Sequence, residues 1–189
     1  EDGMSKNLPN ELTSYDFLKL FAVVVMIVDH LGWYFFQGDP EFRLIGRLCV
    51  PVWFFLIGYA KSRNLDKTLW IGAIVLQLSN FPAGAHILPL NVLATMIAIR
   101  LIIDPLMDRM MRSPQVFWSF SVIFLLLSIP SGMVTEYGTL GLILAMFGWL
   151  VRHRDDLKEP DMILPQFFAF AVGSFAVTQF ASFGFSQAQ

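Results

Sequence analysis

The stretch YDFLKLFAVVVMIVDHLGWYFF, residues 15–36, is long and apolar enough to cross a lipid bilayer, yet it contains four ionisable side chains. They are Asp16, Lys19, Asp29 and His30. A charged group at membrane depth costs about 2.5 kcal/mol or more, and such groups persist mainly where they face a bundle interior or a water-filled cavity. The stretch therefore predicts a helix that borders a polar site inside a membrane protein.

The composition of the chain also favours lipid as its surroundings. Of its 189 residues, 56% are hydrophobic, 19 are phenylalanine and only 15% are charged, and the mean hydropathy is +0.60. These values lie outside the usual range of a soluble domain, and they do not indicate nucleic acid as a partner. The single cysteine, Cys49, excludes an intrachain disulfide and a cysteine-built metal site, and we expect no metal.

Apolar segments separated by proline, glycine or charged residues predict about seven transmembrane helices. They cover residues 14–36, 46–62, 65–82, 90–107, 114–129, 136–151 and 162–183. The expected fold is thus an all-α, polytopic integral membrane helical bundle, with one domain over residues 14–183. Residues 1–13 form an N-terminal tail, and we interpret the three residues before Met4 as a leftover of cloning.

The basic residues between these segments predict the orientation of the bundle, because loops rich in Lys and Arg face the cytoplasm. Three loops carry them: Lys61, Arg63 and Lys67; Arg109 and Arg112; Arg152, Arg154 and Lys158. The loops PAGAHILP, residues 82–89, and PSGMVT, residues 130–135, have none. The N-terminus is therefore expected in the cytoplasm. Arg43 and Arg47 oppose this rule on the external side, which makes them candidate functional residues.

Two polar residues of the first helix are predicted to share one face. Lys19 and His30 are eleven residues apart, which returns to the same face within roughly 20° and spans about 16 Å along the axis. Asp16 lies one turn before Lys19. The spacing favours a polar path from the cytoplasmic to the external side. The alternative is that Asp16 and Lys19 pair near one interface while His30 reaches the headgroups at the other.

Further polar residues are expected at the external level of His30. Asn80 ends the third segment, Asn91 begins the fourth, and Glu136 and Tyr137 open the sixth. Each has an ordinary structural interpretation, since Glu before a helix is commonly a cap and Asn after a proline is commonly a turn residue. Taken together with Asp29 and Arg47, they indicate a site within the membrane.

Four stretches of the chain resemble successive motifs of one family. They are YDFLKLFAVVVMIVDHLG, FRLIGRLCVPVWFFLIGYA, LNVLATMIAI and TEYGTLGLILAMF. In this order they resemble the TraX family, named for the enzyme that acetylates the N-terminus of F-pilin. The first motif is also similar to the wider superfamily of acyltransferase-three proteins and heparan-glucosaminide acetyltransferases, in which a polar residue precedes a histidine by the same spacing.

This resemblance implies an enzyme that moves an acetyl or short acyl group from cytoplasmic acetyl-CoA to an amine or hydroxyl reached from outside. The acceptor would be a protein N-terminus or a glycan, and the location the bacterial inner membrane. His30 would act as general base, with Asp29 and Arg47 as catalytic partners. Lys19 and Asp16 would bind the CoA, and Arg43, Asn80, Asn91, Glu136 and Tyr137 the acceptor.

Two other functions remain open from the residues alone. In a proton- or ion-coupled transporter subunit, the ionisable groups of residues 15–36 would form a relay. The absence of paired inverted halves argues against this function. A noncatalytic assembly partner is the other alternative.

The orientation predicts the outcome of cysteine labelling on intact cells. With Cys49 replaced by alanine, a cysteine at Thr135 should react with a membrane-impermeant reagent, whereas a cysteine at Asp155 should react only after the cells are opened. The reversed pattern would contradict both the orientation and the direction of transfer.

Overall fold

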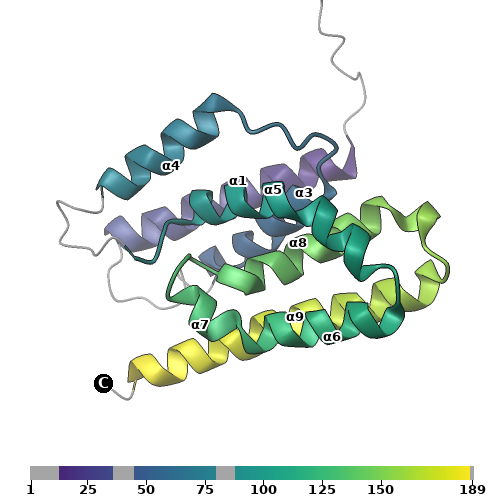
Figure 1. Ribbon diagram of the computed structural model, residues 1–189. Helices are drawn as coiled ribbons and strands as arrows, with labels where there is room; N and C mark the ends of the chain where they lie inside the picture. The colour runs from purple at the N-terminus through teal and green to yellow at the C-terminus, as the bar shows by residue number, and fades with distance from the viewer. Residues whose placement is uncertain (1–12, 36–44, 80–87, 188–189) are drawn as a thin grey trace, which may run out of the picture. The chain divides into compact units, whose positions relative to one another are not determined.

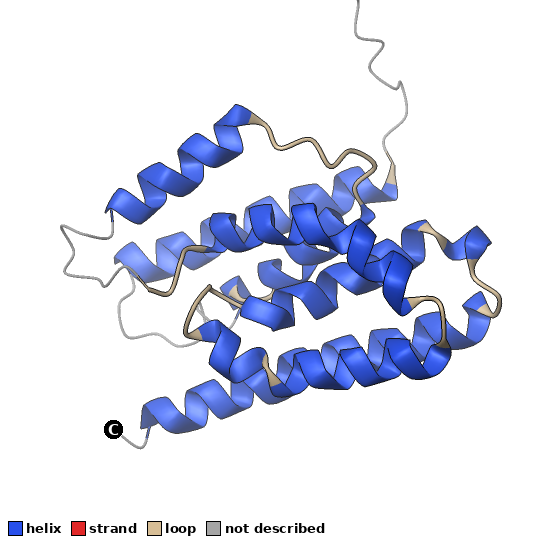
Figure 2. Cartoon of the chain, viewed as in Figure 1, coloured by secondary structure: helices blue, strands red, loops and turns tan. Residues whose placement is uncertain are grey.

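The computed structural model describes residues 13–35, 45–79 and 88–187, and within these ranges it is helical with no strand (Figure 2). The helices are α1 (Ser14–Phe35), α3 (Cys49–Tyr59), α4 (Lys67–Ser79), α5 (Val92–Met110), α6 (Pro114–Leu126), α7 (Ser128–Gly132), α8 (Gly138–Arg152) and α9 (Pro160–Gln187), with a short 3₁₀ turn, η1 (Arg154–Asp156). The chain divides into two units, Glu1–Trp53 and Phe54–Gln189. Each is described by itself.

Unit 1, Glu1–Trp53, contains the opening stretch of the sequence as one unbroken helix. α1 begins directly after Thr13 and ends at Phe35, so both ends of the expected helix are confirmed to within one residue. A tight turn precedes α3, where the backbone N–H of Leu48 donates to the carbonyl of Ile45 at 3.0 Å.

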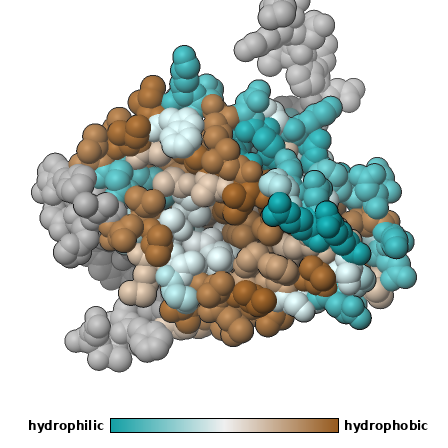
Figure 3. All heavy atoms as spheres, in the orientation of Figure 1, coloured by the Kyte–Doolittle hydropathy of each residue, from teal (hydrophilic) through white to brown (hydrophobic). Residues whose placement is uncertain are grey.

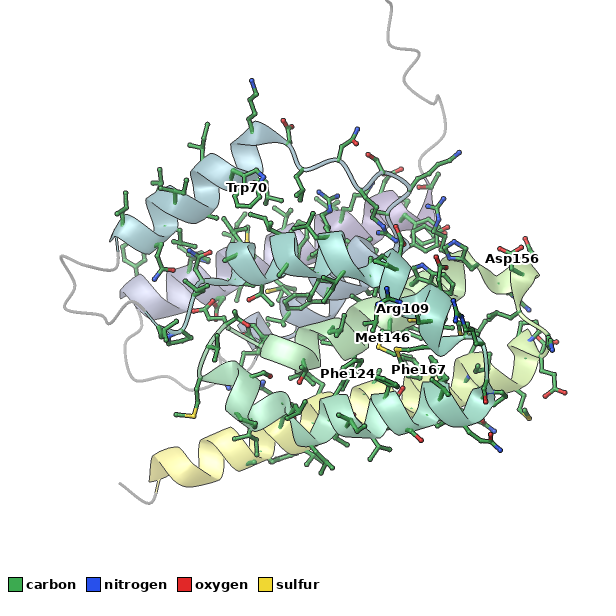
Figure 4. The ribbon with its side chains drawn as sticks, viewed as in Figure 1. Trp70, Arg109, Phe124, Met146, Asp156 and Phe167 are labelled. Carbon is green, nitrogen blue, oxygen red and sulfur yellow. The ribbon has the colours of Figure 1, made fainter. Side chains whose placement is uncertain are left out.

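The core of unit 2, Phe54–Gln189, is α8. This helix packs against α5, α6, α7 and α9, and Figure 1 shows it among them. All residues from Leu140 to Leu150 are buried except the half-buried Phe147. Met146 and Phe167, labelled in Figure 4, are both fully buried. A helix that is apolar on nearly every side must be enclosed by others, which explains the central place of α8.

Glycines allow α3 and α8 to approach each other closely. A Cβ on Gly58 would meet the carbonyl oxygen of Ala145, and a Cβ on Gly148 would meet the carbonyl oxygen of Phe55. One turn before Ala145, a Cβ on Gly141 would lie 2.7 Å from the ring of Phe54. Small residues spaced in this way along a helix let two backbones touch, as is common between membrane helices.

The fifth expected segment is divided, contrary to the prediction of one helix over residues 114–129. α6 ends at Leu126 and the short α7 follows from Ser128. Pro130 explains the division, since it has no N–H to donate to the carbonyl four residues earlier and its ring crowds that carbonyl. The remaining segments are helical near their expected ranges, although α3 and α4 are shorter than expected, with 11 and 13 residues.

One helix among the described residues is long and apolar enough, by length and composition, to cross a membrane. It is the Pro160–Ala181 part of α9, with a hydropathy of 1.4. α3, α4, α6 and α8 are apolar but contain only 11 to 15 residues, fewer than the roughly 17 to 25 that span a bilayer. The all-α fold is confirmed, whereas the seven spans and their orientation stay predictions.

The close approach of α3 and α8 predicts that Gly148→Ala destabilises the protein. The added methyl group has to displace the α3 backbone at Phe55, and overpacking of this kind costs about 1–3 kcal/mol. Gly173→Ala in α9 is the matched control, because a Cβ there meets nothing within 4 Å, and it should be neutral or stabilising by up to about 1 kcal/mol. Unfolding of both purified variants in detergent tests the difference, and equal stabilities would contradict it.

Candidate functional site

The N-terminal turn of α1 joins Asp16 and Lys19 in an ion pair. Lys19 Nζ lies 3.1 Å from Asp16 Oδ1. The other carboxylate oxygen of Asp16 accepts hydrogen bonds from the backbone N–H and the hydroxyl of Thr13, at 3.1 and 2.8 Å. A carboxylate in the first turn is also favoured by the helix dipole. Asp16 thus has a structural role, while Lys19 keeps a side chain that is 58% exposed.

His30 is exposed near the other end of α1, and its ring orientation is set by the helix itself. Nδ1 lies 2.8 Å from the carbonyl oxygen of Met26, one turn earlier. A carbonyl can only accept, so Nδ1 must carry the proton, and in the neutral ring Nε2 then bears the lone pair. His30 therefore has the tautomer that a general base at Nε2 requires. Because α1 is unbroken between Lys19 and His30, the spacing behind their predicted shared face holds.

The side chain of Asp29 lies at the turn that contains Arg47 and precedes α3. The Asp29 carboxylate lies against Gly46, so closely that a Cβ on Gly46 would overlap it. Arg47, the next residue, is half-buried, and its carbonyl accepts the backbone N–H of Val50 at 3.2 Å. The structure thus places the Asp29 carboxylate against Gly46, the residue that precedes Arg47. A catalytic role for either residue stays a prediction, and Arg43 and Asn80, two further predicted site residues, lie outside the described residues.

In unit 2, Asn91 is buried and holds α4 to the start of α5. Its side-chain amide donates to the carbonyl of Ala73 at 2.8 Å and to Gln77 Oε1 at 3.1 Å, and its oxygen accepts from the N–H of Ala94 at 3.1 Å. Its backbone N–H also donates to Gln77 Oε1, at 3.0 Å. Since both amide hydrogens and the oxygen are used within the protein, Asn91 acts here as a helix cap and a tie between helices.

Glu136 and Tyr137 join the same end of unit 2 from the start of α8. The Glu136 carboxylate accepts the backbone N–H of Val92 at 2.8 Å, and the backbone carbonyl of Glu136 accepts the hydroxyl of Thr95 at 2.8 Å. Tyr137 has a left-handed backbone, with φ of 65°, and its ring lies edge-on to Phe54 at 5.9 Å. Asn91 and Glu136 are therefore brought together as expected, through contacts that cap α5. Their binding of an acceptor stays a prediction.

A charged cluster at the opposite end of unit 2 was missed by the sequence analysis. Asp104 accepts two hydrogen bonds from the guanidinium of Arg63, both at 2.9 Å, and one from the indole N–H of Trp149 at 3.0 Å. Arg63 also donates to the carbonyls of Ile57 and Gly58 at the end of α3. The sequence did contain a signal for this cluster, because Asp104 stands within an apolar segment, and an acidic residue in such a segment usually pairs with a polar or charged group.

A family model described as TraX protein matches residues 14–187, which include every described helix. The chain belongs to the TraX family. This match confirms the family that the four motifs resemble, whereas the wider acyltransferase superfamily stays a prediction.

A further comparison relates this TraX-family chain to an uncharacterized protein of Rickettsia prowazekii, RP591. The two are 24% identical over 144 residues, which are 76% of this chain and 58% of the relative. The chain thus spans less than two thirds of that relative's length. No solved structure matches this chain.

The hydrogen bonds of Asn91 predict that Asn91→Ala destabilises the protein by about 1–3 kcal/mol. The substitution removes a helix cap and leaves buried polar groups without their partner. Ser113→Ala is the matched control, because Ser113 occupies the cap position of α6 without a side-chain capping bond, and it should cost less than about 0.5 kcal/mol. Unfolding in detergent measures both, and an Asn91→Ala protein as stable as the unaltered one would contradict the structural role of Asn91.

Proposed function

We propose that this TraX-family chain is a membrane acyltransferase. It moves an acetyl or short acyl group from cytoplasmic acyl-CoA to an amine or hydroxyl reached from the external side of the inner membrane, on a protein N-terminus or a glycan. The family match over residues 14–187 supports the acetyltransferase class. The observation that carries the chemistry is the exposed His30 ring, whose Nδ1 is occupied by the Met26 carbonyl at 2.8 Å.

A membrane location is supported by α9 and by apolar side chains on the outside of unit 2. In Figure 3, brown residues cover much of α6, while teal residues gather where α5 ends and α9 begins. The exposed apolar residues of α6 and α9 include Phe120, Ile123, Leu126, Phe168, Val172, Val177 and Phe180. Apolar patches of this extent are unfavourable in water and ordinary against lipid.

The proposed reaction needs a base, and His30 supplies it. The acceptor nitrogen or oxygen attacks the carbonyl carbon of the thioester while its proton passes to His30 Nε2. The carbon–sulfur bond then breaks, and the CoA thiolate leaves and takes the proton from the imidazolium. An imidazole ring has one nitrogen that can both accept and return this proton.

The other α1 and loop residues receive supporting roles in this proposal. Arg47 or Arg43 stabilises the negative charge on the thioester oxygen in the transition state. Asp29 positions the turn that carries Arg47, and it lies against Gly46 in that turn. Lys19, exposed on the face it shares with His30, attracts the phosphates of the donor. Asp16 holds Lys19 through their ion pair.

The direction of transfer is supported by the distribution of basic residues in unit 2. Arg63 bonds with Asp104 of α5, Arg152 at the end of α8 donates to the Tyr59 carbonyl, and Arg154 pairs with Asp161 at the start of α9. These contacts bring basic loops to one end of the unit, which the positive-inside rule assigns to the cytoplasm. Acyl-CoA is available on that side.

The proposal predicts that His30→Gln lowers acyl transfer by about 10²- to 10⁴-fold, because glutamine keeps polarity and reach but cannot accept a proton near neutral pH. Turnover of acetyl-CoA by purified protein, with a primary amine or a sugar as acceptor, is the measurement. Acetyl-CoA affinity should be retained. Lys67→Gln, which removes an exposed charge at the start of α4, is the matched control and should leave turnover unchanged.

Two results would contradict the proposal. Near-normal turnover of His30→Gln would remove His30 from the mechanism. If the unaltered protein neither binds acetyl-CoA nor turns it over, but moves protons or ions in vesicles in a way that His30→Gln abolishes, the chain is a transporter subunit.

A further inference from the structure

A cavity of about 590 Å³ opens at the basic end of unit 2, between the ends of α5 and α8 and the starts of α6 and α9. Asp156, labelled in Figure 4, marks this end of the bundle. The volume lies within the range of pockets that hold small molecules, about 300–1,000 Å³. None of the residues from which the acyltransferase proposal was built lines this cavity.

Aromatic rings form part of the apolar lining of the cavity, beside aliphatic and methionine side chains. Phe117, Trp118, Trp149 and His153 all contribute. Trp149 and His153 are stacked on each other, with ring centres 3.9 Å apart and planes at 22°. The Trp149 indole is further fixed by its hydrogen bond to Asp104 at 3.0 Å. Phe117 and Trp149 are themselves buried, so the half-buried rings of Trp118 and His153 offer the faces on which a flat ring can stack.

Charged side chains of both signs also line the cavity. Arg112 and Lys158 are exposed cations, and Asp108, Asp156 and Glu159 are exposed carboxylates. The guanidinium and ammonium groups suit phosphate oxygens. The carboxylates are acceptors for an amino group. A hydrocarbon chain would gain nothing from these charges, and a bare phosphate would gain nothing from the rings.

We infer that this cavity binds an adenine nucleotide, namely the nucleotide end of the acyl donor. The base stacks on the aromatic rings, its amino group donates to a carboxylate, and the phosphates are bound by Arg112 and Lys158. The inference rests on the proposed function for the identity of the donor, since CoA ends in a phosphorylated adenosine. For the phosphates of the donor it replaces the role proposed for Lys19 with Arg112 and Lys158, which lie at the end of unit 2 assigned to the cytoplasm.

Calorimetric titration of the purified full chain in detergent tests this site, with adenosine 3′,5′-bisphosphate as the probe. The double variant Arg112→Gln/Lys158→Gln should raise the Kd by about tenfold or more, as expected for lost charge-assisted bonds. Both side chains are exposed, so the fold is retained. Arg154→Gln is the matched control at the same end, because Arg154 pairs with Asp161 and does not line the cavity, and its Kd should equal that of the unaltered protein.

Inorganic pyrophosphate serves as the second probe and separates a nucleotide site from a general anion site. We expect it to bind at least tenfold more weakly than the nucleotide. Equal affinities, or a double variant that binds the nucleotide as the unaltered protein does, would overturn the inference.

The experiments distinguish a failure of the proposed acyltransferase function from a failure of the nucleotide site. If acetyl-CoA is turned over but the double variant binds the nucleotide normally, the acyltransferase stands and the cavity is excluded. If no turnover occurs and nucleotide binding still depends on Arg112 and Lys158, the nucleotide site stands and the acyltransferase is excluded.

Discussion

The basic end of unit 2 depends on the hydrogen bonds that the Asp104 carboxylate accepts. This carboxylate lies on α5, accepts two bonds from Arg63 and one from Trp149 of α8, and so connects three parts of the chain. Arg63 in turn donates to the last carbonyls of α3, which have no partner within that helix. An apolar bundle has few directional contacts, and this charged group fixes how α3, α5 and α8 meet. It also sets the ring of Trp149, and with it the wall of the adjacent cavity.

The opposite end of unit 2 is held by a different kind of contact. There Asn91 and Glu136 both accept backbone N–H groups at the start of α5, where a helix leaves such groups without partners. At this end the Asn91 amide and the Glu136 carboxylate cap a helix, whereas the other end is held by ion pairs. This difference agrees with the orientation predicted from the distribution of Lys and Arg, in which the two ends lie on opposite sides of a membrane.

The proposed chemistry uses both properties of the chain, its polar first helix and its aromatic cavity. α1 is a continuous helix with a base-competent histidine near one end and an exposed lysine near the other. The cavity of unit 2 supplies rings and charges suited to a nucleotide. The proposed acyl donor has a nucleotide at one end, for which the cavity is suited, and a thioester at the other, on which His30 is proposed to act.

The all-α fold, the bounds of α1 and the family could be predicted from the sequence, because they follow from local patterns: an apolar run of helical length, and four motifs in order. The sequence also placed Asn91 and Glu136 together at one end. It did not determine the division at Pro130, since the effect of a proline depends on whether neighbouring helices support a bend, and Pro105 remains inside α5. Nor could it join Asp104 to Arg63 and Trp149, which are 41 and 45 residues away. Only the tertiary structure decided these contacts, because a side chain finds a distant partner through the packing of whole helices and not through any periodicity of its own segment.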